Sequence, residues 1–134
     1  MIYLLDTNTC IQYLNGRNSL VVNKLKSHKP NDIVLCDIVK LELYYGAYKS
    51  ERKDQNLQVL NEFFQEFHSL SFDDQAAKKA GEIRAKLAGL GTPIGPYDLQ
   101  IAAIALVHNL ILVTHNIDEF SRVEGLSYED WEIV

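Results

Sequence analysis

The sequence has few of the features that mark secreted and membrane proteins. It contains only two cysteines, Cys10 and Cys36, too few for the disulfide framework of a small secreted domain. No apolar run approaches the roughly 18 residues that a membrane span needs. The opening residues MIYLLDTN include neither a basic start nor a small-residue cleavage site, so they do not resemble a signal peptide. We therefore expect a reduced, cytoplasmic protein with no membrane partner.

An excess of basic residues is also missing. The chain has 13 Lys and Arg against 18 Asp and Glu, a formal net charge of −5. A simple non-specific nucleic-acid binder is usually basic. The composition argues against that class, and any function on a nucleic acid has to account for the acidic charge.

Several common site motifs are absent. The sequence has no nucleophile elbow, no Walker loop and no Rossmann glycine pattern, so acyl transfer and nucleotide cofactors have no support. The histidines show no zinc-type spacing and are expected at surfaces or helix ends. They are His28, His68, His108 and His115. The two cysteines lie within apolar stretches, which predicts that they pack in the core.

The composition is that of an ordinary globular protein. With 134 residues, 47% hydrophobic and 23% charged, the chain is expected to form a single domain over residues 1–134. The apolar pattern predicts strands at 2–5, 33–36, 70–72 and 110–114. It predicts helices ending at Leu14 and over 19–26, 37–48, 51–67, 73–90 and 98–108. Continuous apolar strands that alternate with helices indicate an α/β fold, with a mainly parallel sheet covered on both faces.

Acidic and amide side chains follow the predicted strands, where such a fold places its site. Asp6 ends the first strand and Asp37 the second, and Asn116 and Glu119 come shortly after the strand at 110–114. Asp98 opens an otherwise apolar helix. The plain alternative is that Asp6 is a turn residue and that Asp37 and Asp98 are helix N-caps.

Glu42 does not fit that alternative. On a helical wheel it falls about 40° from Ile38, inside a stripe that includes Leu41 and Tyr45. A carboxylate on an inward-facing stripe is costly unless a positive charge meets it.

A metal ion is the natural counter-charge for these acids. No Lys or Arg occurs within the segments DTN, LELYYG, PYDL and THNIDEF. Carboxylates that converge cannot all stay ionised without a cation. Hard oxygen ligands favour Mg²⁺ or Mn²⁺ over Zn²⁺. The residues therefore predict metal-dependent chemistry, with hydrolysis of a phosphodiester as the leading case.

Four segments, in order, give the sequence a resemblance to PIN domains, and more narrowly to VapC-type toxins of bacterial toxin–antitoxin pairs. They are Leu4–Asn8, Leu41–Gly46, Pro96–Ala103 and Leu112–Phe120. The resemblance implies a PIN-like three-layer α/β/α sandwich. It also implies a magnesium-dependent endoribonuclease, with Mn²⁺ as a substitute ion, that cuts structured RNA, often tRNA. The expected protein partners are a second copy of the chain, in a homodimer, and a small cognate antitoxin that silences the enzyme.

The resemblance also assigns residues. Asp6, Glu42 and Asp98 match the metal-binding acids of the family, and Thr7 and Asn8 match the polar residues that follow the first of them. The fourth acidic position departs from the pattern. It is filled by Asn116, where many PIN domains carry an Asp, or by Asp118 or Glu119. We favour Asn116, because it follows the strand end by only two residues, and keep Glu119 as its rival.

Two surfaces are candidates for contacts with partners. Phosphate contacts would come from Lys24, Lys26 and Lys29, or from Lys49, Arg52 and Lys53, although one of these groups is expected to be only a solvated face. Large apolar residues on the helices at 37–48 and 51–67 predict an interface with a second copy or an antitoxin. They are Leu43, Tyr44, Tyr48, Leu57, Phe63, Phe64 and Phe67.

Two alternative functions stay open at this point. A catalytically inactive PIN-like binding module would keep the fold without the chemistry, although the complete set of Asp6, Glu42 and Asp98 argues against it. A receiver-like phosphoacceptor domain also gathers acids at strand ends. That domain needs paired acids at the first strand, where this chain has Asp6 followed by Thr7 and Asn8.

Overall fold

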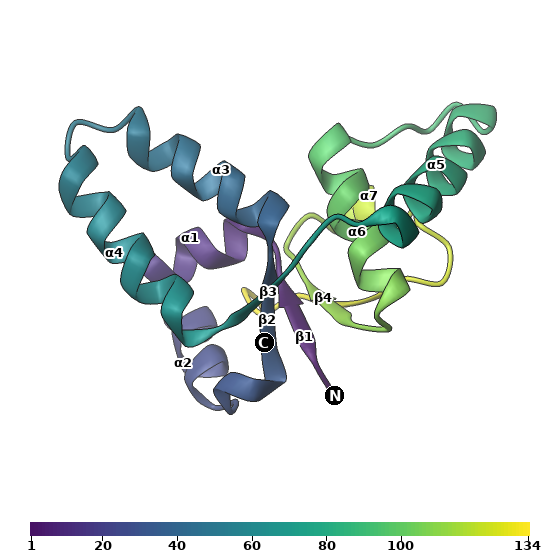
Figure 1. Ribbon diagram of the computed structural model, residues 1–134. Coiled ribbons are helices and arrows are strands. Elements are labelled where there is room, and N and C mark those ends of the chain that lie inside the picture. The colour runs from purple at the N-terminus through teal and green to yellow at the C-terminus, as the bar shows by residue number, and fades with distance from the viewer.

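Short strands alternate with helices along the chain in the computed structural model, which describes residues 1–134 (Figure 1). The strands are β1 (Tyr3–Leu5), β2 (Ile33–Cys36), β3 (His68–Leu70), β4 (Ile111–Val113) and β5 (Ser127–Glu129). The helices are α1 (Thr7–Asn15), α2 (Ser19–Lys26), α3 (Asp37–Tyr48), α4 (Lys53–Glu66), α5 (Asp74–Gly89), α6 (Pro96–Val107) and α7 (Ile117–Phe120), with a 3₁₀ helix η1 (Pro30–Asp32).

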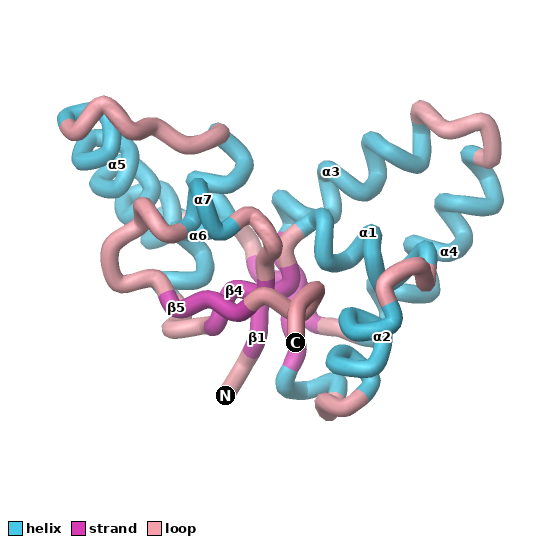
Figure 2. The backbone as a smooth tube through the Cα atoms, turned by 180° about the vertical axis from the view of Figure 1, so that it is seen from behind, coloured by secondary structure: helices cyan, strands magenta, loops and turns pink.

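The five strands form one all-parallel sheet in the order β3-β2-β1-β4-β5. Helices α1 to α4 lie on one side of the strands and α5 to α7 on the other (Figure 1), and the view from behind shows the strands between the two groups (Figure 2). Every residue of β1 and β2 is buried, which explains why these strands read as unbroken apolar runs. The predicted three-layer α/β fold is confirmed.

The strand order places a site between β1 and β4. From β1 the chain runs outward through β2 to β3, and then crosses over to β4 and β5 on the opposite side of β1. In open parallel sheets, ligands bind beyond the carboxyl ends of the strands at the point where the order reverses. Asp6 follows β1 directly and Asn116 comes three residues after the end of β4, so both lie at this point.

The buried apolar side chains form one cluster that receives residues from both helical layers. The buried face of α5 consists of Ala76, Ala80, Ile83 and Leu87, whereas Ala77 and Leu90 are exposed. In α6, all five residues from Ile101 to Ala105 are buried, so this helix is covered on most sides.

Side-chain caps begin two of the helices. Asp73 caps α5, and its side chain accepts a hydrogen bond from the Ala76 amide over 2.9 Å. Asn18 caps α2, and its side chain accepts from the amides of Leu20 and Val21.

The alternative role as N-caps that the sequence left open for Asp37 and Asp98 does not hold. Asp37 is the first residue of α3, and its carboxylate accepts a hydrogen bond from the Ser69 hydroxyl instead of capping the helix. Asp98 lies within the first turn of α6, because the helix already begins at Pro96, a residue whose fixed φ suits the first helical position. The capping role that competed with a functional role for Asp98 is therefore removed.

The short edge strands were the hardest elements to predict. β3 begins at His68, two residues before the predicted strand at 70–72. The pattern predicted neither β5 nor the single-turn helix α7, because segments of three or four residues are too short to show a period.

The predicted apolar interface is mostly core. Leu43, Phe63, Phe64 and Phe67 are buried between α3, α4 and the sheet. The large side chains that α3 exposes are Leu41, Tyr44, Tyr45 and Tyr48.

No helix of the structure combines the length and apolar character needed to cross a membrane. Both cysteines are unpaired and fully buried, which confirms their predicted place in the core.

Candidate active site

Asp6 is held rigidly at the carboxyl end of β1. Its amide donates to the Val113 carbonyl over 3.1 Å, which extends the pairing of β1 with β4 by one residue. Its carboxylate accepts from the Thr9 amide over 2.8 Å and so caps α1. The side chain is only 5% exposed, and this burial raises its pKa, against hydrogen bonds from Thr114 and Thr9 that lower it. Asp6 is therefore both a cap and a buried carboxylate at the switch point.

Asp98 enters the same region from α6. Its pKa is raised from 3.8 to about 7, first by burial, then by a hydrogen bond and the charge of Glu119, and then by the charges of Asp6 and Glu42. The pKa of Glu119 is lowered, chiefly because Asp98 donates that hydrogen bond. The carboxylates of Glu119, Asp6 and Glu42 therefore all act on the charge of Asp98.

Asn116 joins two of these carboxylates. Its Nδ2 lies 3.3 Å from Asp98 Oδ2 and 2.8 Å from Glu119 Oε2. Glu119 Oε1 also accepts a hydrogen bond from the Gly95 amide over 3.2 Å. The turn before α6 and the turn of α7 thus hold Asp98 and Glu119 side by side.

The geometry distinguishes the three candidates for the fourth acidic position. Glu119 brings a carboxylate to Asp98, whereas Asn116 directs its amide nitrogen at both acids. Asp118 is exposed to solvent. The arrangement favours Glu119 over Asn116 as the fourth oxygen ligand, with Asn116 as the residue that orients the pair.

Glu42 reaches the group from α3, though not for the predicted reason. The stripe that was expected to face inward is not buried, since Leu41 is 49% and Tyr45 65% exposed. Glu42 itself is half-buried, and its Oε1 accepts a hydrogen bond from Thr7 Oγ1 over 2.7 Å. Because Thr7 follows Asp6 in sequence, this contact fixes Glu42 beside the start of α1.

The two threonines beside Asp6 were not predicted from the sequence. Thr9 and Thr114 are among the few buried polar residues, at 1% and 0% exposed. Thr9 Oγ1 donates to the Val113 carbonyl over 3.2 Å. The only signal was position, because Thr9 lies three residues after Asp6, where a capped amide is expected.

The donor set fits a hard divalent cation. No Lys or Arg forms an ion pair with any of the four acids. Arg122 is the one cation whose charge acts on Glu119, and its guanidinium donates to the Pro93 carbonyl. Four carboxylates without a paired cation and with only oxygen donors match the preference of Mg²⁺ and Mn²⁺.

Comparison with known proteins gives a consistent result. The family model for the PIN domain matches residues 3–126. The chain is 40% identical to the tRNA(fMet)-specific endonuclease VapC of Salmonella typhimurium over 129 residues, which cover 96% of this chain and 97% of the relative. It is 39% identical to Ribonuclease VapC2 of Rickettsia felis over 133 residues, which cover 98% and 99%.

Solved structures agree with these matches. VapBC2 from Rickettsia felis, bound to a DNA fragment from its promoter, superimposes with a TM-score of 0.91 at 38% identity, covering 98% of this chain and 99% of that one. DNA-bound VapBC from Salmonella typhimurium gives a TM-score of 0.91 at 39% identity, covering 98% of each chain.

Proposed function

Since this chain belongs to the PIN-domain family and is a VapC-type endoribonuclease toxin, we propose that it cleaves a structured RNA, a tRNA, with Mg²⁺ as its cofactor. The observation that carries the proposal is the convergence of Asp6, Asp98, Glu119 and Glu42 at the β1–β4 switch point without a paired cation. Family membership decides against the receiver-like alternative, and the ribonuclease relatives argue against an inactive binding module.

PIN-domain nucleases depend on a metal ion. In this chain Asp6, Asp98 and Glu119 would hold Mg²⁺, and Glu42 would lie at the edge of the site. When bound by these residues, Mg²⁺ would activate water for attack and offset the charge of the scissile phosphate. Its charge would also balance the acidic residues that RNA must approach.

The protein groups around the acids set the geometry. Thr9 and Thr114 fix Asp6, and Asn116 holds Asp98 and Glu119 at a constant separation. Glu42, oriented by Thr7, is placed to accept a hydrogen bond from the attacking water. In-line attack by this water at phosphorus would leave a 5′-phosphate and a 3′-hydroxyl.

The α3 helix offers a path for the RNA away from the acids. Lys49 follows Glu42 by seven residues, two helical turns, so it lies on the same side of α3, about 10 Å further along the axis. Between them, Tyr45 is 65% exposed, and the Lys49 Nζ lies 4.8 Å from the centre of its ring. An exposed aromatic ring with an adjacent cation suits an unpaired base and its phosphate.

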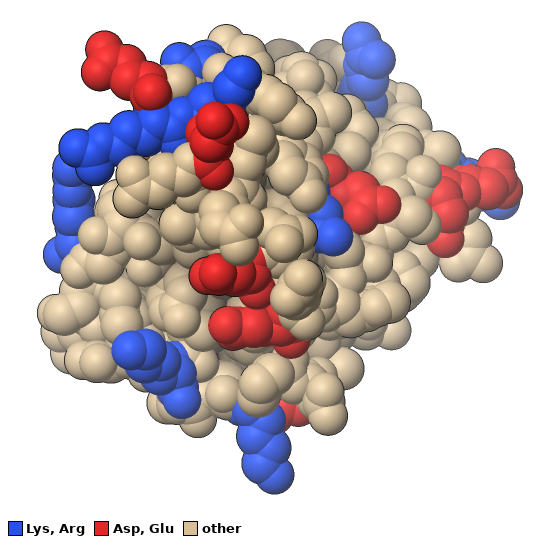
Figure 3. Space-filling model, turned by 60° about the vertical axis from the view of Figure 1, so that its left-hand side comes forward, with Lys and Arg blue, Asp and Glu red and all other residues tan.

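The position of α2 argues against the other basic group, Lys24, Lys26 and Lys29, as the source of the phosphate contacts. Lys26 and Lys29 precede η1 and the start of β2, which is the amino edge of the sheet, opposite the acids. Lys49, Arg52 and Lys53 lie at the turn between α3 and α4. On the face shown in Figure 3, acidic side chains gather near the middle and most Lys and Arg side chains project near the outline. Phosphate groups of the RNA would therefore be bound by a few local basic residues and not by a broad basic surface.

The partners proposed for this chain are a VapB-type antitoxin and a second copy. Relatives were crystallised as VapBC complexes. Helices α1, α3 and α4 enclose a mainly apolar groove of about 320 Å³, lined by Ile11, Leu43 and Val59 among others. Glu42 also lines it, so an amphipathic antitoxin segment in this groove would reach the acidic site. The exposed apolar face of α3, with Leu41, Tyr44 and Tyr48, is our candidate for the homodimer contact.

The test is incubation of the purified protein with total tRNA, with Mg²⁺ or with a chelator, followed by mapping of the cleaved ends. We expect cleavage at discrete positions with Mg²⁺ and none with the chelator. The matched pair of variants is Asp98→Asn and Asp74→Asn, since both residues lie in the first turn of a helix but only Asp98 faces the other acids. Equal cleavage by both variants, or cleavage that persists in the chelator, would contradict the proposal.

A further inference from the structure

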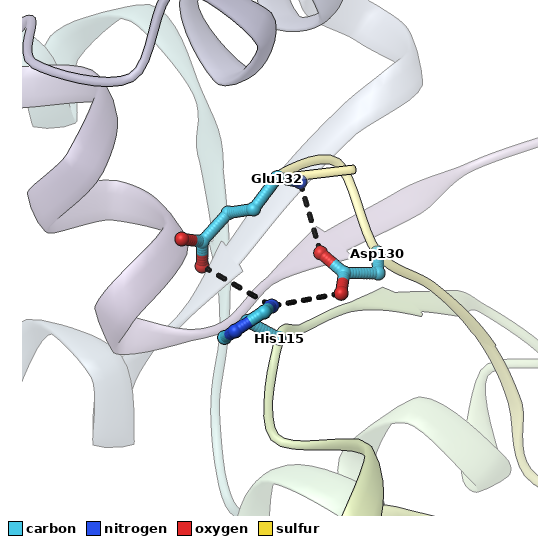
Figure 4. A group of neighbouring side chains, drawn as sticks. All are labelled: His115, Asp130 and Glu132. Atoms are coloured by element: carbon cyan, nitrogen blue, oxygen red, sulfur yellow. Dashed lines mark hydrogen bonds and ion pairs between the residues drawn. The ribbon is translucent and has the colours of Figure 1, made fainter. Parts of the chain in front are cut away.

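A second group of metal-binding side chains lies where the C-terminal segment returns to the sheet (Figure 4). Val113 of β4 pairs with Glu129 of β5, and the Thr114 amide donates to the Glu129 carbonyl over 2.9 Å. This pairing brings the following residues together: His115 Nδ1 lies 2.8 Å from Asp130 Oδ2. The same nitrogen lies 3.9 Å from Glu132 Oε2. From the sequence, His115 was expected only at the surface or at a helix end, and Asp130 and Glu132 had no predicted role.

The segment that carries the two acids is fixed in place. Trp131, between them, is 2% exposed, and its indole nitrogen donates to Glu129 Oε1 over 3.1 Å. Its ring stacks on His28, which follows α2, at 5.2 Å between centroids. The Glu132 amide donates to Asp130 Oδ1 over 2.9 Å, which leaves Oδ2 for His115 alone. The donors are therefore held together before any ligand binds.

The charges of the group do not balance. The Asp130 side chain is 9% exposed and that of Glu132 18% exposed. No Lys or Arg pairs with either acid. Even with a protonated imidazole, two ionised carboxylates leave the group with one net negative charge. One divalent ion with a neutral imidazole would balance the group completely.

We propose that His115, Asp130 and Glu132, none of which belongs to the group of Asp6, Glu42, Asp98 and Glu119, form a second cation site that binds a borderline divalent ion of the Zn²⁺ type. The three donor atoms lie within 4.8 Å of one another. Ligands of one such ion lie about 3 to 3.5 Å apart, given bonds of about 2.0 to 2.2 Å, so only small side-chain shifts are needed. The imidazole nitrogen sets the choice of ion, since Mg²⁺ prefers oxygen alone.

On binding, the divalent ion replaces the proton on His115 Nδ1. The proton that His115 Nδ1 shares with Asp130 passes to solvent, and the nitrogen lone pair then binds the ion. His115 is 58% exposed, so the ion would enter from that side and keep water as its remaining ligands. The site does not depend on the proposed RNA substrate, and its failure would leave the nuclease proposal intact.

The experiment is a titration of the full chain with Zn²⁺, followed by NMR of the histidine ring nitrogens and by calorimetry. The His115 Nδ1 signal should shift with the first equivalent, and those of His28, His68 and His108 should not. His115→Asn should remove one binding event. Glu132→Gln should weaken that event more than about tenfold, by the scale of lost metal-site interactions. The matched controls His108→Asn and Glu51→Gln alter exposed residues without partners and should bind as the wild type does.

Two results would contradict the proposal that His115, Asp130 and Glu132 bind a divalent ion. One is a His115 ring signal that stays in place while Zn²⁺ binds elsewhere. The other is an unchanged number of binding events in His115→Asn, with the thermal unfolding of that variant showing an intact fold.

Discussion

The amide nitrogen of Asn116 lies 2.8 Å from Oε2 of Glu119, so at the fourth acidic position the asparagine supports a carboxylate instead of replacing it. The sequence had suggested that the residue nearest the strand end would be the ligand. The single turn of α7 changes this, because it brings Glu119 back over Asn116 and next to Asp98.

Substitution of Glu119 should therefore change how the cleavage rate depends on the Mg²⁺ concentration. Glu119→Gln removes one charge but keeps the hydrogen bond from Gly95, so the Mg²⁺ concentration for half-maximal cleavage should rise about tenfold or more. Cleavage rate against Mg²⁺ concentration is the measurement. Glu66→Gln, an exposed glutamate outside the site, is the control. Superimposable curves for wild type and Glu119→Gln would return the role to Asn116.

Substitutions of Asn116 should affect stability and cleavage rate differently from the substitution of Glu119. Asn116→Asp removes the donor to two acids and adds a fifth charge, so the metal-free protein should lose stability. Asn116→Ala should lower the cleavage rate about tenfold with a smaller change in Mg²⁺ dependence, because only orientation is lost. Both effects are read from unfolding in chelator and from the rate curves. A tighter Mg²⁺ response in Asn116→Asp without loss of stability would contradict this account.

Neutralising Asp6 or Asp98 should abolish cleavage without unfolding the protein. Asp6→Asn and Asp98→Asn each remove a proposed metal ligand, and we expect a loss of about a hundredfold or more. Stability in chelator should be unchanged or higher, because repulsion among the acids decreases. Cleavage assays and thermal unfolding test both points. Full activity in a folded variant would reject the site.

The stability of the metal-free protein should fall as pH rises through the window set by Asp98. Its pKa is about 7 in the folded chain against an ordinary 3.8, so between these values the folded state holds a proton that the unfolded state has released. Stability is then highest below the window and is lost across it. Asp6, with a pKa also raised by burial, acts in the same direction.

The check on this pH dependence is denaturant unfolding in chelator, at pH values below and above the window. Asp98→Asn should flatten the dependence without removing it, since Asp6 still titrates. Added Mg²⁺ should restore stability above the window. A wild-type protein that gains stability with pH in chelator would disprove the linkage.

The hydroxyl of Thr7 should affect the cleavage rate, because it donates a hydrogen bond to Glu42. Thr7→Val deletes the donor to Oε1 at nearly constant volume, so the cleavage rate should fall about tenfold while the unfolding temperature changes little. Thr7→Ser keeps the hydroxyl and should restore most of the rate. Equal rates for the valine and serine variants would show that Glu42 needs no support from α1.

The groove between α1, α3 and α4 should control inhibition without controlling catalysis. Val59 lines this groove and is 41% exposed, so Val59→Lys should weaken binding of a VapB-type antitoxin and leave RNA cleavage intact. Leu20→Lys on α2, at a residue 40% exposed, is the matched control. Inhibition that survives in Val59→Lys would place the antitoxin elsewhere.

Patterning predicted the elements whose length and burial leave a clear signal. The strand before Asp6, the buried face of α5 and the apolar α6 were all visible, because their apolar residues repeat over whole strands or several turns. The positions of Asp6 and Asp98 were also visible, because one follows an apolar strand and the other lies in the first turn of an apolar helix. Their role in the site stays a prediction.

What escaped prediction depends on contacts between distant segments. Glu42 was noticed for an inward stripe that proves exposed, and its real partner, Thr7, lies 35 residues away. The meeting of His115 with Asp130 requires β5, a strand of three residues without a pattern of its own. Pairing partners across the sheet are set by the tertiary fold, so no local window contains them.

The position of β1 in the sheet has a consequence for the synthesis of this protein on the ribosome. Tyr3 pairs with Ile111, and Asp6 needs Glu119 from the far part of the chain to complete its set of acids. An unfinished chain that stops short of β4 has an open sheet and half a site, so it cannot cut RNA. The enzyme can thus reach its active form only when nearly all of it has been translated.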